Sequence, residues 1–197
     1  LARVNGLFSR SSLNLKSGFD FYINDQSTLS FSGSVGNRDF NRNFVARNHW
    51  FMEPATIDSF YTDESNSTDR DRFYNLNADY QRKFDEEGHQ LQASVYYAAA
   101  NENEGESETV RRTNERFEPI GSEPARSRSR NESPESNLRV EIDYTRPLGK
   151  AKLELGLQSR WDRQEGNYIF EDYHPAGNEW LNNDSISNSL DYLDALQ

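Results

Sequence analysis

The chain has 197 residues, a formal net charge of -11 and no cysteine. The acidic excess argues against a nucleic-acid surface, which needs clustered positive charge, and the missing cysteines exclude disulfides and thiolate metal sites. A mean hydropathy of -1.01 is low for a protein with one large core, yet aromatic residues reach 13%, which is too many for a disordered chain. A folded protein with its apolar residues concentrated in a few places is therefore indicated.

The first predicted elements form a hairpin. Leu1 to Ser11 has only a weak pattern, but from Leu13 to Ile23 apolar and polar residues alternate with a period of two, which predicts a strand with one apolar face. Asn24 to Ser27 is rich in turn-forming residues, and a second alternating strand follows from Thr28 to Gly36. The alternation then fades, so a long polar loop is expected near residues 37–71.

A second hairpin has the same design. Alternating residues from Tyr74 to Phe84 lead into the short turn Asp85 to Gly88, and a returning strand runs from Gln90 to Ala99. Residues 101–136 are again polar, acidic at first and basic later, and we expect a second long loop there.

The third hairpin, Asn137 to Trp161, has the clearest alternation in the chain. Its turn is Pro147 to Lys150, and a third polar stretch near residues 164–184 leads to a seventh strand from Ile186 to Gln197. The two strands of the hairpin place a set of aliphatic side chains on one face: Leu138, Val140, Ile142, Leu153, Leu155 and Leu157.

The order of turns and loops predicts the fold class. The short turns are centred near Gln26, Glu87 and Leu148, about 61 residues apart, with long polar connections between them. Short turns on one side of a sheet and long loops on the other are typical of membrane β-barrels. We therefore predict an all-β protein, a single domain over residues 1–197, whose antiparallel up-and-down meander forms part of a transmembrane β-barrel wall.

The charged face of the strands has to be placed in such a wall. Lys or Arg facing lipid at mid-depth costs about 2–4 kcal/mol, so a barrel requires that several strand cations face a wet lumen: Lys16, Arg139, Lys152 and Arg160. Aromatic residues near the short turns fit an interfacial girdle: Phe19, Phe21, Tyr80, Phe84 and Tyr144. A soluble β-sheet module that binds a glycan or protein is the alternative, because its strands have the same period.

Three segments resemble a known family. Gly18 to Gly33, Asp79 to Leu91 and Asp143 to Lys150, each spanning a short turn, are similar to barrel segments of TonB-dependent receptor-like outer-membrane proteins. The resemblance implies a 22-stranded transporter barrel in the cell outer membrane, an N-terminal plug, and an energy-coupling TonB complex as partner. This chain contains neither the plug nor enough strands, so the remaining barrel strands are expected elsewhere and the transported ligand is unknown.

No catalytic, cofactor or metal site is predicted. The acidic run Asp63 to Asp71 offers oxygens to calcium but lacks the glycine and terminal glutamate of an EF-hand loop. The arginines from Arg126 to Arg130 could hold phosphates, but acidic residues flank them. Other weak motifs are three widely separated histidines and two glycosylation sequons: His49, His89, His174, Asn66-Ser67-Thr68 and Asn131-Glu132-Ser133.

These observations give one functional hypothesis. The chain is part of an outer-membrane barrel for TonB-dependent ligand uptake, not an enzyme, with membrane lipid around the wall and the polar segments as its extracellular, ligand-facing surface. An outer-membrane enzyme or adhesin would need a catalytic cluster or a passenger domain outside this chain. About seven strands are counted, whereas bacterial single-chain barrels use even numbers, so we expect a fragment that cannot close by itself.

Overall fold

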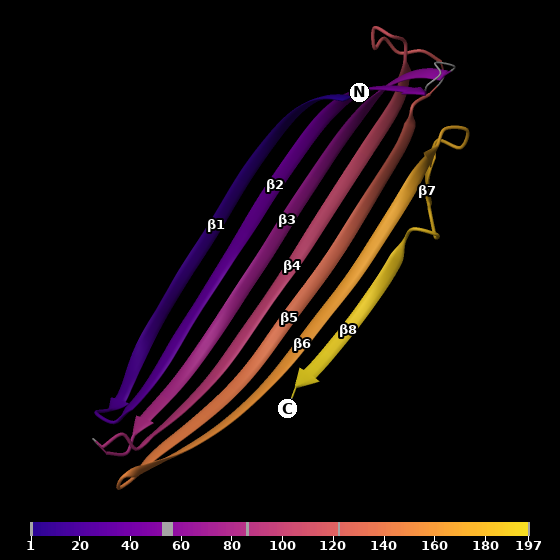
Figure 1. Ribbon diagram of the computed structural model, residues 1–197. Coiled ribbons are helices and arrows are strands. Elements are labelled where there is room, and N and C mark those ends of the chain that lie inside the picture. Colours follow the sequence, from indigo (N-terminus) through magenta and orange to yellow (C-terminus); the bar gives the residue numbers. More distant parts are fainter. Residues whose placement is uncertain (1, 53–56, 86, 122, 197) are drawn as a thin grey trace.

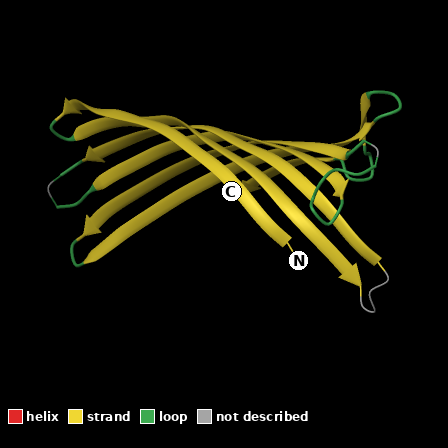
Figure 2. Ribbon diagram, turned by 90° about the horizontal axis from the view of Figure 1, so that it is seen from above, coloured by secondary structure: helices red, strands yellow, loops and turns green. Residues whose placement is uncertain are grey.

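In a computed structural model, which describes residues 2–52, 57–85, 87–121 and 123–196, the chain forms a single curved antiparallel sheet (Figures 1 and 2). Each long strand pairs with the next one along the chain, which is the predicted up-and-down meander. No helix in the described ranges is long and apolar enough to cross a membrane. The strands are β1 (Ala2–Asn24), β2 (Ser27–Met52), β3 (Ile57–Lys83), β4 (Gln90–Thr113), β5 (Ala125–Leu148), β6 (Ala151–His174), β7 (Glu179–Asn182) and β8 (Asn188–Leu196).

Three tight connections lie together at one end of the sheet, which we call the short-turn end; it is at the lower left in Figure 1. In the first, the Gln26 N–H donates to Asn24 Oδ1 at 2.9 Å. In the second, Asp85 Oδ1 accepts the N–H groups of Glu87 and His89, each at 3.0 Å. In the third, Gly149 has a φ of 63°, a left-handed conformation that glycine adopts without steric cost. The sequence predicted all three turns correctly.

The registers align the alternating patterns of neighbouring strands. Side chains directly opposite in an antiparallel pair lie on the same face, and the pairs Phe31↔Ala78, Ala78↔Val95 and Val95↔Val140 continue across β2 to β5. The predicted aliphatic set of β5 and β6 lies on this face too, since Ile142 pairs with Leu157. We call this the outer face and the opposite one the inner face. The four cations expected to face a lumen all lie on the inner face, with Arg139 opposite Arg160.

The described part of the sheet has no buried apolar core. Among the described residues no hydrophobic side chain is buried, and large apolar residues of the outer face are widely exposed, such as Leu155 at 58% and Leu157 at 66%. A single-layered sheet with one apolar face must bury that face against something else. Most outer-face apolar residues form a band in the half of the sheet next to the short turns, which ends near the row Leu13, Asn37, Arg72, Asn101 and Pro134, while a few such as Leu7 and Val45 lie beyond it.

The long loops predicted near residues 37–71, 101–136 and 164–184 are wrong. Most of these residues extend the strands: β2 continues to Met52, β4 to Thr113 and β6 to His174. The second connection is confined to residues 114–124, while residues 53–56 lie outside the described residues. The alternation fades because water on both faces of a strand removes the requirement for one apolar side, whereas the backbone ladder continues. The 26 residues of β2 span about 86 Å at ~3.3 Å per residue.

The single seventh strand predicted from Ile186 is also wrong in detail. Two separate strands, β7 and β8, pair along the same edge of β6, with Glu171 opposite Asn182 and Tyr168 opposite Asn188. Five residues, 183–187, therefore face only Ile169 and Phe170 of β6, and the strand is interrupted by an enlarged bulge. Within the described ranges β1 pairs only with β2, and β8 only with β6, so the first and last strands do not close a ring.

The face assignment can be tested with spin labels. We expect nitroxides at Ile142, Leu155 and Leu157 to be relaxed by oxygen and shielded from a water-soluble relaxation agent in the native membrane, because these side chains lie on the apolar face. Labels at Glu141 and Gln158, which pair on the inner face, are the matched controls and should show the reverse. Equal accessibility of both sets would contradict the assignment.

Hydrogen exchange distinguishes strand from loop in the polar half. We expect the amides of residues 101–110 to exchange slowly, because the ladders with β3 and β5 cover both edges of this segment. Residues 114–121 belong to the connection between β4 and β5, so their amides should exchange faster and provide an internal comparison. Fast exchange throughout residues 101–121 would show that this segment is a loop and not a strand.

Candidate functional site: an acidic ladder on the inner face

Beyond the apolar band, β3 and β4 present carboxylates on the inner face. Glu102, Glu104, Glu106 and Glu108 occupy alternate positions of β4 and therefore share a face. The register places Asp71 opposite Glu102 and Asp69 opposite Glu104. We call the whole group the acidic ladder: Asp63, Asp69, Asp71, Glu102, Glu104, Glu106 and Glu108.

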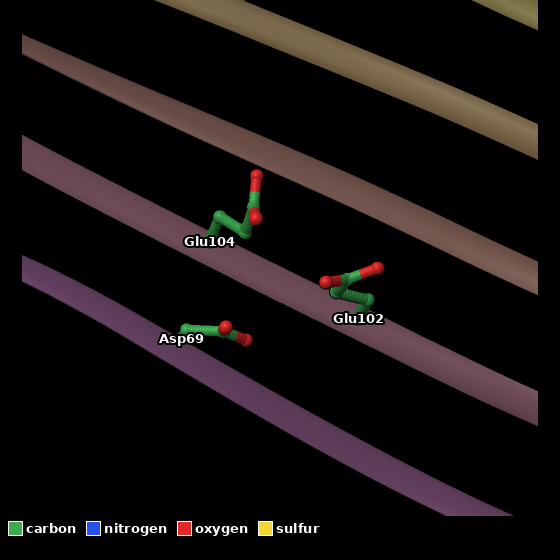
Figure 3. A group of neighbouring side chains, drawn as sticks. All are labelled: Asp69, Glu102 and Glu104. Atoms are coloured by element: carbon green, nitrogen blue, oxygen red, sulfur yellow. The ribbon is translucent and has the colours of Figure 1, made fainter. Parts of the chain in front are cut away.

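The closest part of the ladder is formed by Asp69, Glu102 and Glu104 (Figure 3), whose nearest oxygens lie within 4.8 Å of one another. Partial burial, and then the charges of Asp71 and Glu104, raise the pKa of Asp69 above its usual value. Burial and then the same Asp71 charge raise the pKa of Glu102. These carboxylates therefore hold their protons more tightly than free side chains do.

The ladder is only partly compensated by positive charge. Arg38 Nε lies 3.3 Å from Asp71 Oδ2, while Arg42 donates to Ser67 Oγ at 3.1 Å rather than to a carboxylate. One buried oxygen each of Asp63, Asp69 and Asp71 has no hydrogen-bond partner in the described part of the chain. The arrangement concentrates negative potential, which attracts cations and repels anions, and it offers the oxygen ligands that hard cations prefer.

A groove of about 680 Å³ lies on the inner face at the depth of the apolar band. Tyr96, Arg139, Arg160 and Asp162 contribute to its lining. Arg139 Cζ lies 5.4 Å from the centre of the Tyr96 ring, and Arg160 Nε lies 2.6 Å from Asp162 Oδ2. The inner face is thus charged and polar at the same depth at which the outer face is apolar.

This division between faces is what a barrel wall needs, and a comparison with known families agrees with it. The model of the outer membrane protein beta-barrel family matches residues 82–196, which is more than half of the chain. The chain belongs to this outer-membrane β-barrel family. A comparison with curated proteins found no match. Family membership confirms the predicted membrane-barrel fold and the outer-membrane location, and it excludes the soluble β-sheet module.

In this outer-membrane barrel protein the acidic run from Asp63 to Asp71 is part of a strand. Its alternate residues Asp69 and Asp71 lie on the inner face with Glu104 and Glu102, whereas Glu64 and Arg70 lie on the outer face. The run therefore forms a strand and not a loop, and a strand does not wrap consecutive ligands around one ion as an EF-hand loop does. The first sequon lies in the same strand, and the second lies in β5.

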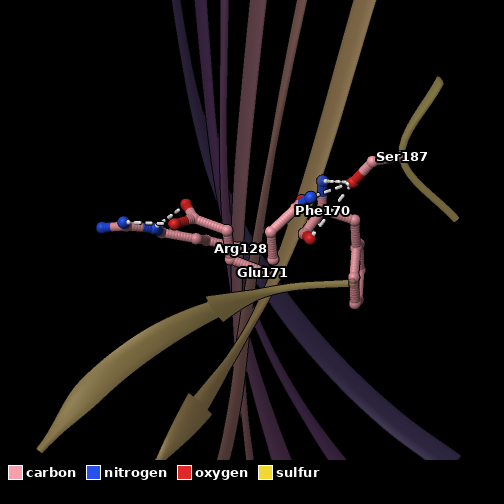
Figure 4. A network of polar contacts seen from close by, with 5 residues as sticks. Arg128, Phe170, Glu171 and Ser187 are labelled. Carbon is pink, nitrogen blue, oxygen red and sulfur yellow. Dashed lines mark hydrogen bonds and ion pairs between the residues drawn. The ribbon is translucent and has the colours of Figure 1, made fainter. Parts of the chain in front are cut away.

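The arginines of the Arg126 to Arg130 segment lie on the outer face of β5. Arg128 makes a two-pronged contact with Glu171 of β6, with Nε donating to Oε2 at 2.6 Å and Nη2 donating to Oε1 at 3.0 Å (Figure 4). The Arg128 Cζ also lies 4.4 Å from the centre of the Trp180 ring. Hydrogen bonds from Arg128 lower the pKa of Glu171. Arg128 and Glu171 thus neutralise each other across β5 and β6.

Ser187 holds the bulge between β7 and β8 against β6. Its Oγ accepts the Phe170 N–H at 3.0 Å (Figure 4). The same Oγ donates to Asn182 Oδ1 at 2.7 Å. The Asn183 N–H donates to the Phe170 carbonyl at 2.8 Å. Both backbone groups of Phe170 are satisfied although the regular ladder is broken there.

The structure does not bring the histidines together. His89 Nε2 lies 2.9 Å from the Tyr144 hydroxyl beside a short turn, and its ring stacks on Phe84 with centres 4.4 Å apart. His49 stacks on Phe60 near the other end of β2, and His174 ends β6. The predicted girdle residues Phe84 and Tyr144 thus meet around His89.

Sequence reasoning missed the acidic ladder. The sequence showed Glu102 to Glu108 as an acidic stretch. The signal that was overlooked is that these glutamates recur at every second residue, which indicates one face of a strand. Their opposition to Asp69 and Asp71 required the register between β3 and β4, which the sequence does not contain.

Neutralising the ladder should change the pH dependence of stability. The folded pKa of Glu102 is raised, so its ionised form destabilises the folded state, and this penalty grows as pH rises from the unfolded pKa through the folded one. We expect Glu102→Gln to stabilise the protein at pH 7 by about 0.2–1 kcal/mol, the weight of a cross-strand pair, and to have no effect at pH 3. Urea unfolding of the membrane-inserted protein measures this.

The control for this experiment is Glu64→Gln. Glu64 is on the same strand pair but on the outer face, opposite Thr109. It should give a smaller change at pH 7. A stabilisation by Glu102→Gln that persists at pH 3 would show that charge repulsion is not its cause.

Proposed function

We propose that this protein is an uptake receptor of the TonB-dependent type, in which these strands form one sector of a larger barrel wall. The observation that carries the proposal is strand length: β2 has 26 residues and β3 has 27, whereas about 9–11 residues suffice to cross a membrane. Tilted near 45°, β2 rises about 60 Å, well beyond an apolar band of about 25 Å. A tall wall outside the membrane suits a receptor that must enclose a ligand before it passes inward.

The proposal includes partners outside this chain. The open edges of β1 and β8 would leave unpaired N–H and C=O groups in hydrocarbon, each costing several kcal/mol, so further barrel strands are needed beside them. A plug domain and the energy-coupling TonB complex complete the receptor, and outer-membrane lipid surrounds the apolar band. The partners are solutes, lipid and protein, and no nucleic acid or catalytic step is assigned to this chain.

The acidic ladder lies on the inner wall in the polar half of the strands, where an incoming ligand would pass. Negative potential on such a wall favours neutral or cationic solutes over polyanions by raising the local concentration of positive charge. The polar half of the wall therefore selects solutes by charge, and the proposal does not name the transported compound.

The proposal is tested on the intact protein with the purified periplasmic domain of TonB. We expect direct binding in detergent solution, and no binding to a variant that lacks the segment preceding the barrel. In planar bilayers the intact protein should show no open channel, because a plug fills the lumen. A steady open conductance without TonB binding would instead identify a passive pore of the same family.

Orientation gives a separate prediction. Because the chain has no cysteine, single cysteines can be introduced without background from this segment. We expect an impermeant thiol reagent to label intact cells at Glu106, Arg128 and Tyr173, in the polar half, and not at Glu87 or Gly149 in the short turns, which should be periplasmic. Labelling at the two turn positions alone would show that the barrel has the opposite orientation in the membrane.

A further inference from the structure

Beside the acidic ladder, the inner face of β1 and β2 carries arginines and phenylalanines in alternation. The register places Phe8 opposite Arg42 and Arg10 opposite Phe40. Arg10 is an even number of residues from Lys16 on β1, so these four side chains lie on the inner face with it. We call this group the arginine–phenylalanine surface: Phe8, Arg10, Phe40, Arg42 and Phe44.

The rings of this surface are open to the lumen. Phe8 is 72% exposed, and Phe40 and Phe44 are partly exposed. The Phe44 ring packs over Gly6 on β1, which has no side chain to lift the ring away from the sheet. The Arg42 Cζ lies 5.4 Å from the centre of the Phe40 ring. The rings therefore form a platform on which an apolar or aromatic group can pack.

The two arginines of this surface have no carboxylate partner. Arg42 Nη2 donates to Ser67 Oγ at 3.1 Å, and within residues 2–52, 57–85, 87–121 and 123–196 no ion pair joins Arg10 or Arg42 to a carboxylate. Arg38, which lies nearer the apolar band, pairs instead with Asp71. Arg10 and Arg42 are thus available to an anionic group of a ligand.

Two or three strand spacings separate these guanidinium groups from the acidic ladder. Arg42 on β2 is opposite Ser67, which is opposite Glu106 on β4. Arg10 on β1 is three strands from Glu104 on β4 at the same level. At about 4.8 Å between strands, these two separations are about 10 and 14 Å. A solute that engages both columns needs an anion and a cation that far apart.

Uncharged hydrogen-bonding groups continue the inner face on β5. Ser127, Ser129, Asn131 and Ser133 occupy alternate positions there, and Asn131 is opposite Glu104. Hydroxyls and carboxamides bond both N–H and C=O groups. A fatty acid has no cation for the ladder, and a polyamine has no anion for the arginines. A peptide has both charges at its ends, amide groups between them and side chains for the ring platform.

We propose that the arginine–phenylalanine surface and the acidic ladder together bind an extended zwitterionic peptide. Its carboxylate lies on Arg10 and Arg42, and its ammonium group lies on Glu104 and Glu106, with an apolar side chain on the Phe40 ring. Three or four residues at ~3.3–3.6 Å each span about 10–14 Å, which matches the separation of the two columns. The inference rests on the proposed uptake function, because it names the class of solute that the receptor takes up.

The experiment titrates the intact protein in detergent solution, by calorimetry, with a tripeptide of alanine, phenylalanine and alanine. We expect the peptide with free termini to bind. Amidation of its carboxyl end and acetylation of its amino end should each weaken binding about fivefold, the upper weight of an exposed ion pair. Arg10→Gln/Arg42→Gln should weaken binding of the free peptide as much as amidation does. Amidation should have no further effect on this variant.

The matched control is Arg70→Gln. Arg70 lies at the same level on β3 but on the outer face, opposite Asp39 and Asn103, so its loss should leave the peptide affinity unchanged. Circular dichroism and thermal unfolding check that each variant is folded. The proposal is overturned if the free peptide does not bind, if amidation still weakens binding in the double variant, if the control loses equal affinity, or if a diamine binds as tightly as the peptide.

Peptide binding is measured without TonB, so the two proposals can fail separately. A protein that binds the periplasmic domain of TonB but not the peptide would overturn this inference alone. A passive pore that binds the free peptide more tightly than its capped forms would overturn the uptake function and keep the peptide site.

Discussion

The structure depends on backbone hydrogen bonds that continue from strand to strand. In hydrocarbon every N–H and C=O must find a partner within the protein, and here the ladders run unbroken along almost the whole length of β2 to β5. There is no buried apolar core among the described residues to hold these strands together. The apolar side chains therefore do not pack the protein internally, and they set the depth at which the ladder lies in the membrane.

The same constraint explains which parts of the fold the sequence predicts. From Leu138 to Tyr144 lipid lies on one side and a wet lumen on the other, so every second residue is apolar and the strand is unmistakable. From Glu102 to Glu108 water lies on both sides, and hydropathy no longer distinguishes strand from loop. The three short turns were predictable because turn residues act locally, through the Asn24 side chain or the left-handed Gly149.

The candidate site could be predicted only in part. The acidic composition of the stretch was visible in the sequence. Which face its glutamates occupy, however, depends on how β4 is aligned with β3, and their partners on β3 depend on how far that pairing extends. The interruption after Asn182 was hidden for a different reason. Its geometry rests on the Ser187 hydroxyl and the Asn183 N–H replacing ladder contacts at Phe170, and serine and asparagine occur in many ordinary loops as well.

Charge takes over from hydropathy as the property that specifies faces in the polar half. On β4 the glutamates from Glu102 to Glu108 alternate with Asn103, Gly105 and Ser107, so the pattern still has a period of two. A slip of one residue against β3 would move every one of these carboxylates to the outer face. There they would lie on the same face as Arg70 and no longer on the same face as Asp69 and Asp71. The register inherited from the apolar band thus keeps the carboxylates of the acidic ladder on the inner face.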